Sequence, residues 1–307
     1  MVDILLAAYN GEKFISEQLD SLLEQSYQEF RILIHDDNSN DRTVDIVKEY
    51  EAKYPDKVRL ISDDVKCGSS VSNFMYLTKC ADSDYVMYCD QDDYWLPDKI
   101  NVTLSKMQEV EKKVGKEKPV LIFADYKPVN SELIEITYDN SENQIFSYNL
   151  DFNRLLVQNY VTGCLMMVNK ALYSIMGEYH KDILMHDWWA ALIASAMGKI
   201  YHIPENVMLY RQHGDNVVGV VNVKSLEYRL RKFLDPSTKN MKYLYENQAK
   251  IFLSRYEKEL NSEILKNLHD FLSISEQSCK WKRIAMLKKG NFLKSDKIRQ
   301  LGQFWYI

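Results

Sequence analysis

The sequence contains few of the residues that mark specialised or unfolded chains. Among its 307 residues are five cysteines, ten glycines and six prolines. The cysteine count is odd and no Cys-x-x-Cys pair occurs, so neither a disulfide framework nor a zinc ribbon is predicted. The glycine and proline content excludes collagen-like and mucin-like chains, and 46% apolar residues exclude a wholly disordered one. We therefore expect a folded protein of the reducing cytosol.

Long hydrophobic runs are also missing. The longest uncharged apolar segment, residues 188–197, has ten residues, whereas a membrane-spanning helix needs about 20. The first residues carry no basic stretch ahead of an apolar one, so they do not resemble a secretory signal. We expect no transmembrane helix and interpret residues 2–8 as a buried strand.

Basic charge is scarce at first and then concentrated. Residues 224–307 hold 18 Lys and Arg against 9 Asp and Glu, while the remaining 223 residues hold 21 against 35. Residues 279–307 interleave eight basic residues and one acid with aromatic and aliphatic ones. Two interpretations stay open: a surface for anionic lipid at the inner face of the plasma membrane, or a solvated helix pair packed on its own domain. Nucleic acid is not expected, because the rest of the chain is acidic.

The first 126 residues alternate short apolar runs with helical patterns, which predicts βαβ units and a largely parallel sheet. Expected strands are residues 2–8, 30–35, 58–61, 85–89 and 120–124, and expected helices are 13–25, 42–54, 70–80 and 97–114. Further along we expect loops at 138–149 and 214–219, strands at 161–168, 200–202 and 207–210, and a helix at 187–197. From 224 onward the pattern is helical. We predict an α/β domain over residues 1–222 and a basic helical region over 223–307.

Polar clusters follow three of the predicted strands. They are Ala8-Tyr9-Asn10-Gly11, His35-Asp36-Asp37-Asn38-Ser39 and Asp90-Gln91-Asp92-Asp93. In open parallel sheets, ligands bind outside the carboxyl ends of the strands, so all three clusters should face one crevice. The carboxylates of the last cluster would repel one another unless a cation compensated them, and oxygen ligands suit Mg²⁺ or Mn²⁺ bridging to phosphate. The alternative is an exposed acidic turn that caps the next helix.

The motifs taken together resemble a known family. Asp90-Gln91-Asp92-Asp93-x-Trp95-x-Pro97-x-Lys99, with Ala7-Ala8-Tyr9-Asn10-Gly11 and Asp36-Asp37-Asn38-Ser39-Asn40-Asp41, is similar to the family 2 glycosyltransferases over residues 2–215. The Asp-Gln-Asp-Asp-x-Trp version resembles bacterial rhamnosyltransferase-like enzymes of surface-polysaccharide biosynthesis. The resemblance implies a GT-A (Rossmann-like) fold, a mostly parallel central sheet flanked by helices, with the helical C-terminal region as an extension.

The resemblance also implies a site for a dTDP- or UDP-sugar. Tyr9 would stack on the pyrimidine, Asp37 would accept a hydrogen bond from the base N–H, and Ala7 would supply backbone contacts. Lys66, in the loop 66–69, lies where the family often contacts the nucleotide. An aromatic ring and a carboxylate suit these tasks chemically. The structural alternatives are a turn aromatic for Tyr9 and a capping role for Asp37.

The metal and diphosphate would be held at the fourth strand end. By the resemblance, Asp90 lies on the ribose and metal side and Asp92 binds Mn²⁺ or Mg²⁺. His213 would be a further metal ligand, and Arg211 would clamp the diphosphate. A lone histidine is also often structural.

Asp187, in Met185-His186-Asp187-Trp188-Trp189, matches the family's catalytic base before an aromatic-rich helix. It would deprotonate the hydroxyl of a saccharide or lipid-linked acceptor, and a single base implies inversion at the anomeric carbon. Capping of the helix is the alternative.

Two other functions fit parts of the pattern. A phosphoacceptor signalling module would use Asp36-Asp37, with Asp63-Asp64 and Lys127 as imperfect partners, but it leaves Asp90-Gln91-Asp92-Asp93 unexplained. A sugar-phosphate nucleotidyltransferase would need a Gly-rich, Arg-containing loop after the first strand, which Asn10-Gly11-Glu12 does not supply. The sequence therefore favours an inverting, metal-dependent glycosyltransferase.

Overall fold

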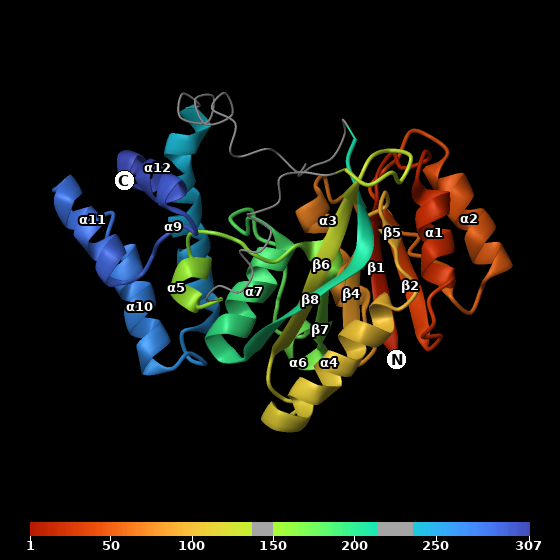
Figure 1. The fold of residues 1–307 in the computed structure, drawn as a ribbon, viewed down its shortest axis with the longest axis horizontal. Coiled ribbons are helices and arrows are strands. Elements are labelled where there is room, and N and C mark those ends of the chain that lie inside the picture. The colour runs from red at the N-terminus through yellow and green to blue at the C-terminus, as the bar shows by residue number, and fades with distance from the viewer. Residues whose placement is uncertain (137–149, 214–235) are drawn as a thin grey trace.

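The computed structural model describes residues 1–136, 150–213 and 236–307. Its amino-terminal half is a parallel sheet made of β1 (Val2–Ala8), β2 (Phe30–Asp36), β3 (Val58–Leu60) and β4 (Tyr85–Cys89), in the order β3-β2-β1-β4. The central strands β1 and β4 are largely apolar and buried on both faces, as parallel strands covered by helices must be, whereas the edge strand β3 is partly exposed. Their carboxyl ends lie together at one edge (Figure 1).

The helices of this half are α1 (Ile15–Leu23), α2 (Thr43–Lys53), α3 (Ser70–Cys80) and α4 (Lys99–Val114). The predicted bounds of α3, residues 70–80, are confirmed at both ends. The helix begins there because Ser69 is its N-cap and accepts a hydrogen bond from the Ser72 N–H. The other three are shorter than predicted. Pro97 lies ahead of α4, whose N-cap is Asp98.

The second half of the sheet is mixed. β7 (Met166–Asn169) runs antiparallel between β4 and β6 (Val120–Val129), and β8 (Lys199–Arg211) pairs parallel with β6 and antiparallel with β5 (Tyr94–Trp95). The strand predicted at 161–168 is wrong in its first part, where a 3₁₀ turn, Gly163–Leu165, precedes β7. The strands predicted at 200–202 and 207–210 are one strand, β8, with register irregularities opposite residues 124–127.

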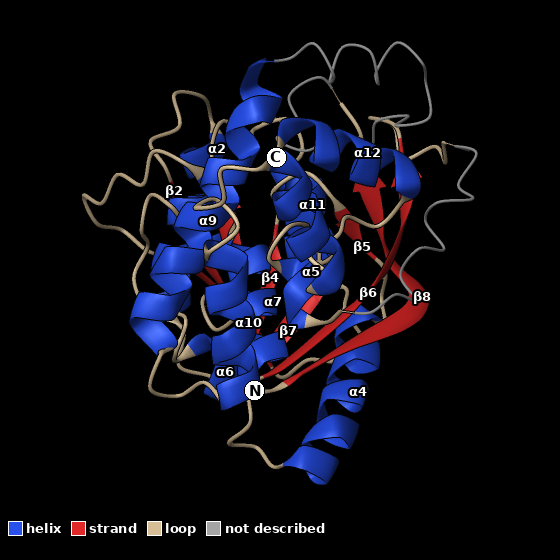
Figure 2. Cartoon of the chain, turned by 90° about the vertical axis from the view of Figure 1, so that its left-hand side faces the viewer, coloured by secondary structure: helices blue, strands red, loops and turns tan. Residues whose placement is uncertain are grey.

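Short helices α5 (Phe152–Leu155) and α6 (Lys170–Tyr173) precede the long buried helix α7 (His186–Met197). The carboxyl-terminal helices are α9 (Pro236–Tyr256), α10 (Ser262–Leu272), α11 (Lys280–Lys289) and α12 (Lys297–Tyr306). Figure 2 shows them in front of the sheet, on the side of α7. The predicted loops 138–149 and 214–219 and the predicted boundary near 222 lie outside the described residues or at their margin. None of the described helices has the length and apolar character to cross a bilayer.

Two apolar cores cover the two faces of the sheet. One contains α1, α2 and α4, with Leu19, Val47 and Ile100 among its buried residues. The other contains α3, α7 and the carboxyl-terminal helices. In the second core the Trp189 ring lies 5.5 Å from the Phe252 ring of α9, measured between centroids. The basic helices are therefore anchored to the same core as α7.

Candidate active site

The loop after β1 presents Tyr9 to solvent. Its side chain is 56% exposed, but its backbone is fixed. The Tyr9 N–H donates to Gln91 Oε1 at 2.8 Å, and Gln91 Nε2 donates to the Tyr9 carbonyl at 2.8 Å. The Gln91 side chain thus joins two of the predicted strand-end clusters and fixes the backbone that carries the exposed Tyr9 ring. The motif contains Gln91, but no spacing rule predicts this contact.

Gly11 closes the same loop onto Gln91. A Cβ at Gly11 would lie 2.3 Å from Gln91 Oε1, so any larger residue would displace the amide. Asn10 next to it adopts a positive φ of 48°, and its N–H donates to Ser39 Oγ at 2.7 Å. The first and second strand ends are therefore interlocked.

Asp37 lies between β1 and the loop that carries Lys66. The Asp37 N–H donates to the Ala8 carbonyl at 2.9 Å, and Asp37 Oδ1 accepts from the Cys67 N–H at 2.7 Å. Ala7 is half-buried in β1, and Lys66 is exposed beside Cys67. The structure thus brings the predicted nucleotide-binding residues to one edge of the sheet.

Carboxylates crowd the end of β4. The atoms of Asp90, Asp93 and Cys164 that could bind a metal, one carboxylate oxygen from each Asp and the Cys Sγ, all lie within 4.8 Å of one another. Burial, and then the charge of Asp92, raise the pKa of Asp90 to about 7. Burial raises the pKa of Asp93 as well. Asp93 Oδ1 accepts from the Arg211 N–H at 3.1 Å, while Oδ2 is buried without a partner in the described part of the chain.

A buried lysine lies beneath these carboxylates. Lys99 Nζ donates to the Cys164 carbonyl at 2.5 Å and lies 3.5 Å from the Trp95 ring centroid. Burial lowers the pKa of Lys99 to about 8, and the carboxylates of Asp90 and Asp93 oppose that shift. Lys99 therefore acts as an internal counter-charge, a role that its place in the motif does not by itself predict.

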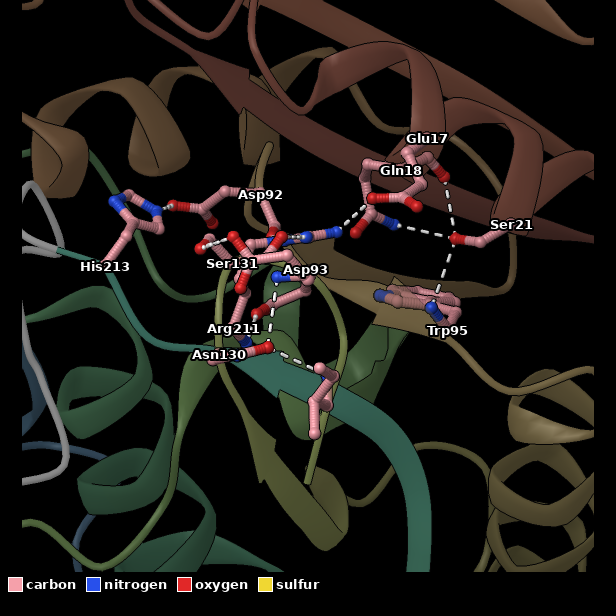
Figure 3. Close-up of polar contacts among 12 residues, drawn as sticks. Glu17, Gln18, Ser21, Asp92, Asp93, Trp95, Asn130, Ser131, Arg211 and His213 are labelled. Atoms are coloured by element: carbon pink, nitrogen blue, oxygen red, sulfur yellow. Dashed lines mark hydrogen bonds and ion pairs between the residues drawn. The ribbon is translucent and has the colours of Figure 1, made fainter. Parts of the chain in front are cut away.

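Asp92 points the other way, toward His213. Asp92 Oδ2 lies 2.9 Å from His213 Nε2 (Figure 3), and the imidazole packs on Phe14 with ring centroids 4.9 Å apart. The predicted metal residues are thus divided: Asp92 is paired with His213, and Asp90 with Asp93 and Cys164. Carboxylate and imidazole are ligand types that divalent cations accept.

Arg211 is 1% exposed and is surrounded by protein groups. Its Nε donates to the Asp92 carbonyl at 2.7 Å, and its terminal nitrogens contact the Ser131 carbonyl and the Glu17 carboxylate (Figure 3). The guanidinium therefore anchors the backbone of Asp92. A diphosphate clamp, the role predicted for Arg211, would require some of these contacts to open, and that role stays a prediction.

Asp187 is buried at the start of α7. Its Oδ1 accepts from the Trp188 N–H at 2.6 Å and from Asn159 Nδ2 at 3.0 Å. Burial raises the pKa of Asp187 to about 7, and the charge of Asp90 adds to the rise. A carboxyl group with this pKa can take up a proton near neutral pH. Asn159 orients this carboxyl group. The two residues are 28 positions apart, so the sequence alone does not predict their contact.

The neighbouring His186 is uncharged. Its ring packs against those of Phe74 and Tyr88, with centroids 4.2 and 4.9 Å away, and burial lowers its pKa to about 3. A Cβ at Gly163 would lie 2.5 Å from His186 Nε2. Glycine there lets the 3₁₀ turn approach α7 closely and hold Asp187 near the acidic strand end.

A family model described as glycosyl transferase family 2 matches residues 3–174. The chain belongs to this family. The match covers the strand-end clusters of the sheet. The family resemblance drawn from the motifs is confirmed, and the phosphoacceptor and nucleotidyltransferase alternatives are set aside.

Relatives with curated descriptions include the dTDP-rhamnosyl transferase RfbG of Shigella flexneri, 28% identical over 233 residues, which are 70% of this chain and 73% of that protein. The putative teichuronic acid biosynthesis glycosyltransferase TuaG of Bacillus subtilis is 31% identical over 109 residues, covering 36% of this chain and 42% of TuaG. The chain spans 60% of the length of an uncharacterised Mycobacterium tuberculosis relative that is 25% identical over 70% of this chain.

Solved structures confirm the predicted fold. S. aureus TarS 1–349 superposes with a TM-score of 0.61 at 15% identity, covering 99% of this chain and 86% of that one. The mannosyltransferase PcManGT of Pyrobaculum calidifontis, in complex with GDP-Man and Mn²⁺, gives 0.55 at 16% identity, covering 99% and 84%. At these identities the likeness establishes the fold alone, and the GT-A prediction holds.

Proposed function

We propose that this glycosyltransferase moves a sugar, rhamnose or a hexose, from a nucleoside diphosphate onto a saccharide or lipid-linked acceptor, with inversion, in the biosynthesis of a cell-surface polysaccharide. One observation carries the proposal. Asp187 is a buried carboxyl group with a pKa raised to about 7, and the negative charge of Asp90 contributes to this rise. This electrostatic contact supports a single site that contains both the proposed base and the acidic strand end. The description of RfbG supports a dTDP-sugar donor.

The donor's base would stack on the exposed ring of Tyr9, with Asp37 accepting from the base N–H. Ala7 and Lys66 would complete the nucleotide contacts. A UDP-sugar fits the same chemistry, since uracil and thymine share the imide N–H that a carboxylate recognises. The rigid Gln91 bridge supports this assignment because stacking gains most on a surface that is already ordered.

Mn²⁺ or Mg²⁺ fits the residues present. Asp92 and His213 face each other at 2.9 Å. Half-buried Asp90, whose pKa the charge of Asp92 helps to raise, belongs to the neighbouring group with Asp93 and Cys164. The ion, when bound, would neutralise charge on the departing diphosphate. The Lys99 ammonium would compensate part of the negative charge of Asp90 and Asp93 while no ion is bound.

In the transfer itself, Asp187 would accept the proton of the acceptor hydroxyl while Asn159 and the Trp188 N–H hold the carboxylate in place. One base acting opposite the leaving group gives inversion at the anomeric carbon. The aromatic residues of α7 would limit the access of water to the same carboxylate.

The test is nucleotide release and product formation with UDP-, dTDP- and GDP-sugars, after a thermal-shift screen with and without Mn²⁺ has selected the donor. Asp92→Asn and Asp187→Asn should each abolish transfer while the protein stays folded. Asp56→Asn, at an exposed position, is the matched control. Turnover at the wild-type rate by either site variant would contradict the role assigned to that residue.

A further inference from the structure

Helix α12 turns an apolar face to solvent. Ile298, Leu301 and Trp305 are 49, 67 and 59% exposed, and their spacing of three and four residues places them on one side of the helix. The glutamines of α12 bond inward: Gln300 Nε2 donates to the Lys294 carbonyl and Gln303 Nε2 to the Phe292 carbonyl, both at 2.8 Å. This is the reverse of an ordinary surface helix, whose polar side faces water.

The start of α11 adds a second aromatic residue beside the end of α12. Trp281 is 79% exposed. Its neighbour Lys280 donates from Nζ to the Trp305 carbonyl at 2.9 Å and lies 5.4 Å from the Trp305 ring centroid. Contact through Lys280 thus joins the two helix ends. We call Trp281, Ile298, Leu301 and Trp305 the apolar patch.

Basic side chains border the patch. The sequence of α11 contains five Lys and Arg and no acid, and α12 contains two and no acid. Lys282, Lys288 and Lys297 are exposed. Exposed tryptophans with lysines around them match the interfacial region of a bilayer, where indole rings sit at headgroup depth and cations meet anionic lipid.

We propose that the apolar patch and its basic border dock this protein on an anionic membrane surface. A second copy of the chain is disfavoured as the occupant, because a two-fold contact would bring two basic borders together. In Figure 1, α11 and α12 lie at the side of the molecule away from α2, and in Figure 2 this side faces the viewer. The surface is therefore placed where a flat partner can reach it.

The docked helix connects directly to the site. The Ser295 N–H, just before α12, donates to Gln158 Oε1 at 2.9 Å, and the next residue, Asn159, holds Asp187. The segment just before the docked helix thus contacts the segment that holds the proposed base, an arrangement that suits a lipid-linked acceptor. This last step rests on the proposed function, whereas the docking itself does not.

The experiment is co-sedimentation of the full chain, without substrates, with vesicles of phosphatidylcholine alone or mixed with phosphatidylglycerol. We expect binding to the anionic vesicles, weakened by high salt. Tryptophan fluorescence should shift to the blue and be quenched by brominated lipid. The signal is specific to the patch because Trp95, Trp188 and Trp189 are buried.

The double variant Leu301→Ser/Trp305→Ala should bind anionic vesicles on the order of tenfold more weakly or worse. Lys282→Glu/Lys297→Glu should do the same, while Lys112→Glu, exposed on α4, should not. All variants change exposed residues, so their melting temperatures should match the wild type. Absence of vesicle binding, equal binding by the patch variants, or self-association that the patch variants abolish would overturn the proposal. Failure of the wild-type protein to bind anionic vesicles, while it still transfers sugar to a soluble acceptor, would reject docking alone.

Discussion

Replacing Asp187 with asparagine should stabilise the protein at alkaline pH while it removes activity. Burial and the charge of Asp90 raise the pKa of Asp187 from 3.8 to about 7. At about 1.4 kcal/mol for each tenfold change in proton affinity, the ionised carboxylate destabilises the fold by about 4 kcal/mol. Asparagine keeps an acceptor oxygen for the Trp188 N–H and for Asn159 but carries no charge.

The pH dependence follows from the direction of the pKa change. Because the folded pKa is raised, the stability that protonated Asp187 confers is complete below about pH 4 and is lost as the pH rises through about 7. The free energy of unfolding of Asp187→Asn, minus that of the wild type, should therefore increase by up to about 4 kcal/mol between about pH 4 and pH 8.

Urea denaturation followed by tryptophan fluorescence measures this difference at each pH, with Asp56→Asn as the control for losing one exposed charge. Transfer by Asp187→Asn should fall by about 10²–10⁴-fold at every pH. A stability difference that stays constant with pH, or a variant that still transfers sugar, would refute the assignment of Asp187 as a buried base.

Two further substitutions test the donor side of the site. Tyr9→Ala should weaken nucleotide binding by about 1–3 kcal/mol, the size of a base-stacking contact. The melting temperature should not change, because the ring is largely exposed. Calorimetric titration with UDP or dTDP measures the affinity, and an unchanged affinity would remove Tyr9 from the site. Arg211→Met should cost about 2–4 kcal/mol of stability, since the Asp92 and Ser131 carbonyls lose a buried donor. If Arg211→Met instead keeps wild-type stability and loses only diphosphate affinity, the clamp is the better interpretation.

Short-range sequence patterns predicted the elements whose structure depends mainly on neighbouring residues. The apolar strand runs and the periodicity of the first helices predict most of the parallel half of the sheet, and the order of the motifs identifies the family. The misplaced segments, 161–168 and 200–210, belong to the mixed half. There, pairing with β4 and β6 determines where a strand begins, and residues distant in sequence supply those partners.

The site divides in the same way. The strand-end pattern predicts that Tyr9, Asp37 and Asp92 face one crevice, and the family resemblance adds Asp187 to that site. The structure adds side-chain contacts between residues that are distant in the sequence, which motif spacing does not predict. Asn159, 28 residues away in the sequence, donates a hydrogen bond to the Asp187 carboxylate. The Arg211 side chain, predicted to face a ligand, is directed at Asp92 and Glu17.

The ammonium of Lys99 is enclosed between Trp95 and the Cys164 carbonyl. Because of this burial, the effects of substitutions at positions 99 and 93 should depend on each other. Removing the ammonium alone would leave the buried carboxylate of Asp93 without its compensating cation, and removing Asp93 alone would leave the cation without its anion. A double substitution such as Lys99→Met with Asp93→Asn should therefore be tolerated better than either single change. Anyone redesigning this enzyme for another donor must treat the two residues as a unit.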